Sequence, residues 1–362
     1  MRNPIVDNPE VLPKQVDASS SGSAQAGRQI ARAAGIVMIA YVLSTLVGVV
    51  RGVVVSHAFG TSVSLDSFNA ANRVTELLFN LTAGGALGSA FIPMFTGYLT
   101  RKDQKGAWRL ASGVVNSVLI VLILVSTLMW IFAPFLVERG LFALVPDSSP
   151  VQVAETARLL RIMLPTVIIF GISGLVMGML NAHQVFLWPA LAPAAYSLGI
   201  ILGVLLLPEA WGITRLAIGA VIGAGGHLLL QLPALFRLPA RKYELAAGFR
   251  DAPVRRVLRL MLPRIFGAGI VQLNFVANTI ISLSLGAGSA SALTWAFTLM
   301  LMPQAAIAQS AGTASLPTLS AQVELGKSDD FRQTLSNIVR VMLLLALPAT
   351  IGLVLLRVPL VR

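Results

Sequence analysis

Long apolar runs alternate with short polar segments along nearly the whole chain. Each run is close to the roughly 20 residues that a helix needs to cross the hydrocarbon core of a bilayer. The β-barrel pattern, in which segments of about ten residues alternate between apolar and polar positions, does not recur. We therefore predict an all-α polytopic membrane protein with about nine transmembrane helices. They are placed at Ala33 to Phe59, Phe68 to Leu99, Trp108 to Pro134, Thr156 to Asn181, Phe186 to Leu207, Ile213 to Phe236, Pro263 to Leu285, Ala292 to Ser320 and Gln333 to Val358.

A faint internal repeat lies within this pattern. The stretch GALGSAFIPMFT, Gly85 to Thr96, returns as QSAGTASLPTLS, Gln309 to Ser320. Both copies are small-residue runs that end in an apolar residue, a proline and a threonine. Two related halves facing each other would explain them, as in transporters that bury a site between repeats, although so few identities leave chance similarity open.

Composition supports a membrane location. Hydrophobic residues make up 56% of the chain, charged residues 12%, and the mean hydropathy is +0.80. A soluble globule of this length would need far more polar surface. The absence of cysteine rules out disulfides and cysteine-ligated metals.

The net charge of +12 is concentrated in alternate loops. Lys and Arg residues precede the first predicted helix and follow the second and the sixth, whereas the loops 60–67 and 286–291 carry none. This is the positive-inside pattern, and it predicts a cytoplasmic N-terminus. Nucleic-acid binding is disfavoured, because no aromatic or base-reading elements lie among the cations.

Two polar segments flank the helical region. Residues 1–27 lack the apolar core of a signal peptide and are predicted to be a disordered cytoplasmic tail. Residues 237–262 form a basic cytoplasmic loop, within which Arg250 to Leu262 has the pattern of an interfacial amphipathic helix that touches anionic lipid. A plain connector is the alternative for that segment.

Ionisable and amide residues inside the helices are the candidates for function. Arginine is costly within a bilayer, so Arg51 requires a wet cavity, an anionic ligand or Glu76 as its partner. The next helix carries polar residues at helical spacing on one face. They are Asn69, Asn72, Arg73, Glu76 and Asn80. Arg73 and Glu76 are three residues apart, so a structural ion pair is as good an explanation for them as a binding site.

A second candidate wall comes from the seventh helix, which begins with Arg264 and carries Gln272, Asn274 and Asn278. Amides in membrane helices commonly bond only to neighbouring helices, so packing is the alternative interpretation. Arg264 is placed to reach lipid headgroups or to meet an anionic group that comes from the cytoplasmic side.

Catalytic and metal-binding patterns are missing from the sequence. His57, His183 and His227 are scattered, and neither HExxH, a Walker A motif nor a Ser/His/Asp arrangement occurs. We expect no enzymatic activity, no cofactor and no metal site.

Several ordered motifs resemble the MurJ (MviN) family of lipid II flippases. They include an arginine in the first helix, Phe59-Gly60, Asp66-Ser67-Phe68 and Ala90-Phe91-Ile92-Pro93. The resemblance continues through Leu159 to Ala182, Pro189 to Ile201, Gln231 to Pro233 and Ser315 to Ser320. It implies a multidrug/oligosaccharidyl-lipid/polysaccharide (MOP) exporter fold, a MATE-like bundle of two helical lobes around a cationic cavity. Family members usually have more helices, so residues 28–236 would form a complete N-lobe and residues 263–362 a partial C-lobe.

The chain also departs from the family pattern. Thr45 follows Ser44 where an arginine is common, and Gly52 stands where an aspartate often follows Arg51. Phe79 and Asn80 occupy a site that usually holds an arginine, while Phe297 and Thr298 replace an Asp-Arg pair. Only Arg51 carries over cleanly, and Arg73 and Arg264 are conjectured replacements for the lost charge.

The resemblance implies a flippase that moves lipid II, an undecaprenyl-pyrophosphate-linked saccharide, across the bacterial cytoplasmic membrane for cell wall biosynthesis. Its implied partners are that lipid and the membrane lipids. The expected binding residues are Arg51, Asn72, Arg73, Glu76, Asn80, Arg264 and Asn274. An exporter of another polyprenyl-linked polysaccharide and a homologue that no longer transports are the alternatives.

Overall fold

The computed structural model describes residues 39–356, except for 82–85, 144, 146–148, 246–247 and most of 305–325. Every regular element in this part is helical. The predicted tail, residues 1–27, and nearly all of the second repeat copy, 309–320, lie outside the described residues.

The helices follow the predicted order. They are Ile39–Phe59, α2 (Val63–Phe79), α3 (Ala86–Thr100), α4 (Gln104–Leu136), α5 (Pro150–Ala182), α6 (Leu187–Leu206), α7 (Thr214–Leu229), α8 (Leu232–Phe236), α9 (Ala252–Ser284), α10 (Ser289–Gln304) and α12 (Ser328–Leu355). A short π-helix, η2 (Val137–Leu141), continues from the end of α4, and a 3-10 turn, η3 (Glu209–Trp211), lies between α6 and α7. Seven helices in the described part are long and apolar enough to span a membrane.

The second and seventh predicted helices differ from the structure. The run predicted from Phe68 to Leu99 is two helices, since α2 ends at Phe79 and α3 begins at Ala86. α2 also begins earlier, at Val63, because the Ser62 side chain accepts a hydrogen bond from the Leu65 amide and caps the helix. The arginine-rich segment up to Leu262 is not a separate interfacial helix. It forms the first turns of α9, where Val254, Val257 and Met261 are buried on one face.

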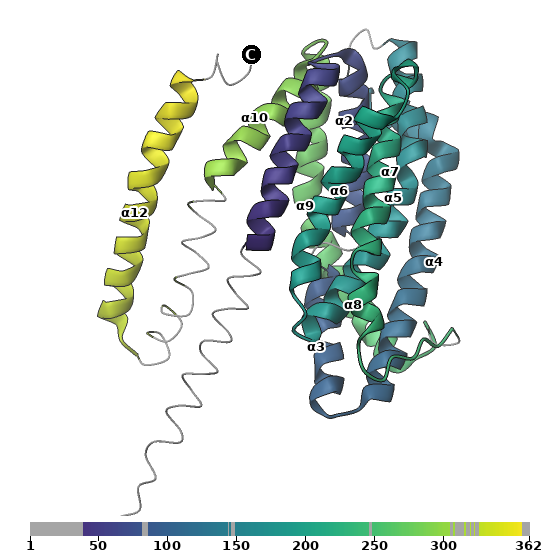
Figure 1. The fold of residues 1–362 in the computed structure, drawn as a ribbon, viewed down its shortest axis with the longest axis vertical. Helices are drawn as coiled ribbons and strands as arrows, with labels where there is room; N and C mark the ends of the chain where they lie inside the picture. The colour runs from purple at the N-terminus through teal and green to yellow at the C-terminus, as the bar shows by residue number, and fades with distance from the viewer. Residues whose placement is uncertain are drawn as a thin grey trace, which may run out of the picture.

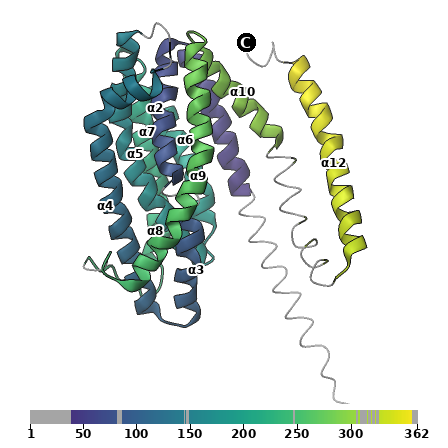
Figure 2. The same ribbon diagram turned by 180° about the vertical axis from the view of Figure 1, so that it is seen from behind.

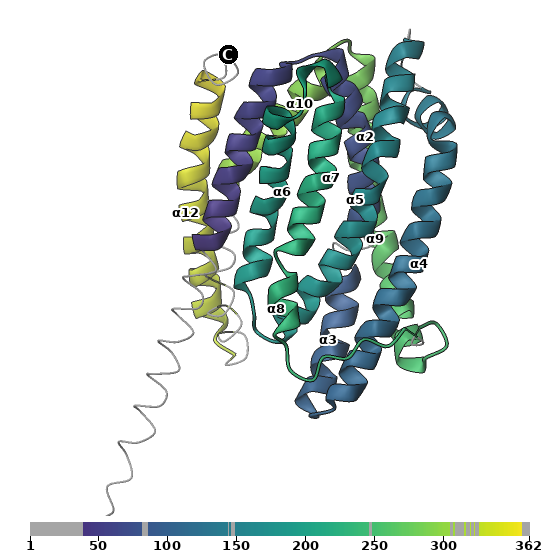
Figure 3. The same ribbon diagram turned by 45° about the vertical axis from the view of Figure 1, so that its right-hand side comes forward.

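The helices from α2 to α8 form one bundle, with α4 at its outer edge (Figure 1). α9 lies against α3 and α2 on one side of that bundle, as the reverse view shows (Figure 2). α10 contacts α2 and α9, and α12 stands beside α10 at the margin of the molecule (Figure 3). None of the α12 residues is buried, as is common for a helix that faces lipid.

Glycines bring α6 and α7 into backbone contact. A Cβ atom added at Gly199 would lie 2.2 Å from the Cα atom of Gly223, and one added at Gly203 would lie 2.4 Å from that of Gly219. Small residues at this spacing allow close helix approach. Close packing of α6 against α7 is therefore the role of these glycines.

The basic loop between α8 and α9 is bound along α4. The Trp108 indole donates to the Pro239 carbonyl (3.2 Å), and the Glu244 amide donates to the Ser112 hydroxyl (3.0 Å). Arg109 on α4 forms an ion pair with Asp251 at 2.8 Å. The loop therefore fixes the beginning of α9 to the bundle, at what we call the basic end of the molecule.

Candidate functional site

Two arginines lie at similar depth within the bundle. Counted along their helices at about 1.5 Å per residue, Arg51 and Arg73 are roughly 12 to 15 Å from the ends remote from the basic loops. The Arg51 guanidinium carbon is 6.0 Å from the centroid of the Tyr196 ring on α6, and that of Arg73 is 5.1 Å from the Phe275 ring on α9. We call these four residues the cationic layer. Each guanidinium is placed against an aromatic face, where cation–π attraction stabilises it.

The Arg73–Glu76 ion pair predicted from the spacing is confirmed. Arg73 Nη1 and Glu76 Oε2 are 2.9 Å apart, and the two side chains are 21% and 43% exposed. Arg51 takes part in no ion pair in the described part of the chain, although Arg51 and Glu76 both act electrostatically on Tyr196. Two guanidinium groups and one carboxylate leave the layer with a net positive charge.

The polar face of α2 is turned toward α9 and α10. The Asn69 amide donates to the Ser291 hydroxyl on α10 at 3.1 Å, as Arg73 meets Phe275 on α9. Asn72 is half-buried on this face, and Asn80 is the half-buried residue that ends α2. Asn69 and Arg73 thus lie on one face of the helix, as their spacing predicted.

Arg264 and Asn274 are not brought into the cationic layer. Both are exposed on α9, and Asn274 Oδ1 accepts a 3.3 Å hydrogen bond from Asn278 Nδ2. Arg264 lies about 16 Å closer to the basic end than Phe275 does, from the rise of the helix. Arg264 is thus at a different depth from the layer, whereas Asn274 adjoins Phe275 at nearly the same depth but is exposed.

Asp66 on α2 binds the start of α10, a contact that the sequence did not predict. Its carboxylate is 1% exposed and lies at the N-terminus of α10. Oδ2 accepts from the Gly288 amide (2.6 Å), and Oδ1 accepts from the Ser291 amide (2.7 Å) and hydroxyl (2.6 Å). Hydrogen bonds from backbone amides at a helix start are favourable for a carboxylate, because the helix dipole adds to them. We call this contact the Asp66 clasp.

The backbone is tightly packed around the clasp. Gly288 has φ +82, and a Cβ atom there would lie 2.6 Å from the Thr61 carbonyl oxygen. A Cβ atom built at Gly52 would lie 2.9 Å from the Trp295 ring on α10. A side chain larger than glycine at position 52 would therefore require the Trp295 ring to shift. The Gly288–Thr61 contact packs the start of α10 against the turn before α2, at the end remote from the basic loops.

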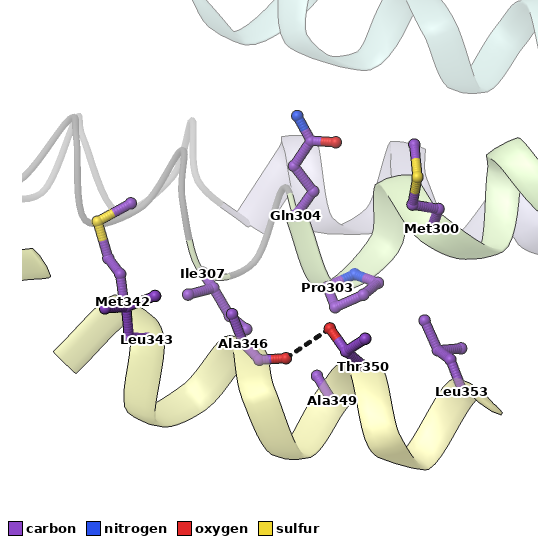
Figure 4. Close-up of a pocket in the computed structure, with 10 residues that line it drawn as sticks. All are labelled: Met300, Pro303, Gln304, Ile307, Met342, Leu343, Ala346, Ala349, Thr350 and Leu353. Carbon is purple, nitrogen blue, oxygen red and sulfur yellow. Dashed lines mark hydrogen bonds between the residues drawn. The ribbon is translucent and has the colours of Figure 1, made fainter. Parts of the chain in front are cut away.

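The structure contains an apolar pocket of about 380 Å³ away from the cationic layer, between α10 and α12. Met300, Pro303 and Ile307 line one wall, and residues of α12 from Met342 to Leu353 line the other (Figure 4). The Thr350 hydroxyl is occupied by the Ala346 carbonyl at 2.8 Å. This pocket fits hydrocarbon and offers no charge to an anionic headgroup.

The family model and the curated relatives that match this chain belong to one family. Residues 55–362 match the family model described as "Lipid II flippase MurJ". The chain is 30% identical over 326 residues to "Lipid II flippase MurJ" of Burkholderia cenocepacia, covering 88% of this chain and 62% of that relative. It is also 30% identical over 351 residues to "Probable lipid II flippase MurJ" of Bdellovibrio bacteriovorus, covering 95% and 66%. The chain thus spans less than two thirds of the length of these curated relatives.

Solved structures agree with this result. "Lipid II flippase MurJ, inward closed conformation" is 26% identical, with a TM-score of 0.74, covering 90% of this chain and 66% of that one. An inward-facing multidrug transporter of the MATE family and MOP superfamily has a TM-score of 0.69 at 17% identity, covering 88% and 71%. The latter similarity concerns the fold alone, and it supports the predicted MOP-type architecture.

Proposed function

This chain belongs to the lipid II flippase MurJ family, and from that premise we propose that it moves lipid II between leaflets by alternating access. The family and the apolar helices make it a multi-pass protein of the bacterial inner membrane. We further propose that its basic end, and with it the N-terminus, faces the cytoplasm, because cationic loops are retained on that side.

The alternating-access proposal rests on one contrast. The Asp66 carboxylate of the clasp is fully hydrogen-bonded, whereas in the cationic layer Arg73 is in an ion pair and Arg51, among the described residues, is not. The clasp lies nearer the proposed outer face, so it would separate the layer from the outside. Arg51 would then be reached from the cytoplasmic side. A diphosphate in a site of low dielectric would gain strong charge-assisted hydrogen bonds from this guanidinium.

The order of the cations along α9 and α2 suggests a route. Arg264, exposed about 16 Å closer to the basic end, would make the first contact with the anionic headgroup. Arg73 and Arg51 would receive it at depth, and Arg73 would leave Glu76 to do so. Breaking the Asp66 clasp would then open the layer toward the outer leaflet.

A reconstituted translocation assay tests this function. The complete gene product would be placed in vesicles with fluorescent lipid II, and arrival in the opposite leaflet would be followed by a membrane-impermeant quencher. We expect transport by the parent protein and its loss in Arg51→Ala, with Arg332→Ala, an exposed residue near the start of α12, as the matched control. Absence of lipid II transport by the parent would contradict the proposal.

A further inference from the structure

Two arginines on α5 lie outside the site described above. The exposed residues of this helix recur at helical spacing as Val151, Ala154, Arg158 and Pro165, and the partly buried Arg161 adjoins them. Arg158 and Arg161 are three residues apart and share one side of the helix. The exposed residues next to them on this side are apolar.

This side of the helix faces lipid rather than the inter-lobe region. The cationic layer is built by Ile39–Phe59, α2, α6 and α9, whereas Arg161 meets α4, at the opposite edge of the molecule from α10 and α12 (Figure 1). Trp130, Ile131 and Phe132 of α4 are each about half exposed beside it. An apolar surface of this kind on a membrane protein is in contact with acyl chains.

The depth of the arginines follows from a contact on the same helix. Glu155 accepts a 3.3 Å hydrogen bond from Ser64, which lies in the first turn of α2. At about 1.5 Å per residue, Arg158 is roughly 4 to 5 Å and Arg161 roughly 9 Å further into the membrane than Glu155. Given the proposed orientation, this is the level of the outer-leaflet headgroups and the uppermost acyl carbons, where tryptophan is also enriched.

The Nε atom of Arg161 is hydrogen-bonded to α4, whereas its terminal nitrogens are available to a ligand. Its Nε donates to the Trp130 carbonyl at 2.9 Å, and its Cζ lies 4.9 Å from the centroid of the Trp130 ring. The terminal nitrogens make no hydrogen bond to a described residue, and the ion pairs in that part of the chain include neither arginine. At the level of the headgroups, the phosphate of an anionic lipid is the partner that the surroundings can supply.

We propose that Arg158 and Arg161, with Trp130, form a binding site for the phosphate of an anionic phospholipid in the outer leaflet. The planar guanidinium of Arg161 suits bidentate contact with phosphate, and Arg158 adds a second charge one turn closer to the surface. A resident lipid at this place would anchor the α4–α5 pair while the lobes move. The site depends on the proposed orientation but not on the identity of the transported lipid.

The test uses the lack of native cysteine. Ala154→Cys places a single thiol on the same side of α5, one turn from Arg158, and a fluorophore attached there reports which lipids are near. The labelled full chain is reconstituted in phosphatidylcholine vesicles that contain brominated phosphatidylglycerol or brominated phosphatidylcholine as the quencher. We expect half-maximal quenching at a concentration of brominated phosphatidylglycerol at least about fivefold lower, as expected for one basic residue near anionic lipid.

Substitutions separate charge from structure. Arg158→Gln with Arg161→Gln should make the two quenchers equal, whereas Arg101→Gln with Lys105→Gln removes as much charge at the basic end and should leave the preference unchanged. Arg161→Lys keeps the charge without the fork geometry and should keep part of the preference. Equal quenching in the parent, or a preference that survives the double glutamine variant, would overturn the proposal.

Discussion

The Asp66 clasp and the cationic layer lie only about 10 Å apart along α2, yet their polar groups are satisfied in opposite ways. The carboxylate of the clasp is buried and accepts three hydrogen bonds from the start of α10. The layer holds one arginine in a partly exposed ion pair and another that faces a tyrosine ring. Complete pairing fixes one arrangement of the lobes, whereas incomplete pairing leaves positive charge for a ligand.

The largest effect should come from breaking the clasp. Asp66→Ala leaves the Gly288 and Ser291 donors without an acceptor, and we expect the closed arrangement to lose about 2 to 4 kcal/mol relative to an open one. Ala290, which is 3% exposed, can be replaced by cysteine as a reporter. Its labelling from outside by an impermeant maleimide should accelerate more than about tenfold, in line with that energy.

The control for this prediction is Asp103→Ala. Asp103 also caps a helix, accepting from the Gly106 amide, but it lies at the basic end. It should not change the labelling of the reporter at position 290. Equal labelling rates in the parent and in Asp66→Ala would mean that the clasp does not hold this end closed.

Arg51→Ala should have the next largest effect, on transport. Loss of the guanidinium that forms no ion pair in the described part of the chain is expected to reduce lipid II translocation by about tenfold or more, the cost of one or two charge-assisted bonds. Arg51→Lys should retain part of the activity, because it keeps the charge without the fork geometry. Transport at the parent rate in Arg51→Ala would remove this residue from the site.

Glu76→Gln should increase the unpaired positive charge of the cationic layer without changing the clasp. The Arg73–Glu76 pair is partly exposed and three residues apart on one helix, so its loss should change the free energy of unfolding by less than about 0.5 kcal/mol. Arg73 would then be free for the headgroup, and half-maximal transport should need less lipid II. Weaker binding in Glu76→Gln would show that the carboxylate, and not the released arginine, contacts the substrate.

Arg264→Ala should have the smallest effect. An exposed arginine near the basic end acts on the approach of an anionic lipid more than on its final binding. We expect a decrease of about threefold in the initial transport rate at low salt, and a smaller decrease at high salt because the attraction is screened. A loss as large as that of Arg51→Ala at both salt concentrations would place Arg264 in the binding layer.

The sequence predicted the features that depend on residues close together in the chain. The helical spacing of Asn69, Arg73 and Glu76 was enough to predict the polar face of α2 and the ion pair, because both depend on neighbours within a few turns. Asp66 was visible only as part of a family motif, since its partners lie 222 and 225 residues away. An aspartate two residues before the predicted helix start at Phe68 was the available signal, but nothing in the sequence indicated that it would be buried or which helix it would cap.

Other differences have similar causes. The first turns of α9 looked like an interfacial helix because their arginines are exposed, but the buried positions Val254, Val257 and Met261 continue the helix into the membrane. Arg264 and Asn274 were predicted to join the site from their polarity alone, which determines neither the depth of Arg264 nor the side of α9 on which Asn274 is exposed. The collision between a residue larger than Gly52 and Trp295 could be recognised only from the packed structure.

A reversible crosslink across the clasp tests the central claim most directly. The Asn69 and Ser291 side chains are in contact at 3.1 Å, so Asn69→Cys with Ser291→Cys places two thiols within reach of a short bis-methanethiosulfonate crosslinker in a protein that otherwise has no cysteine. We predict that crosslinking abolishes lipid II translocation and that reduction, which removes the crosslinker, restores it, while each single-cysteine variant transports under both conditions. Undiminished transport by a fully crosslinked protein would show that the lobes need not separate at Asp66, and would contradict the account.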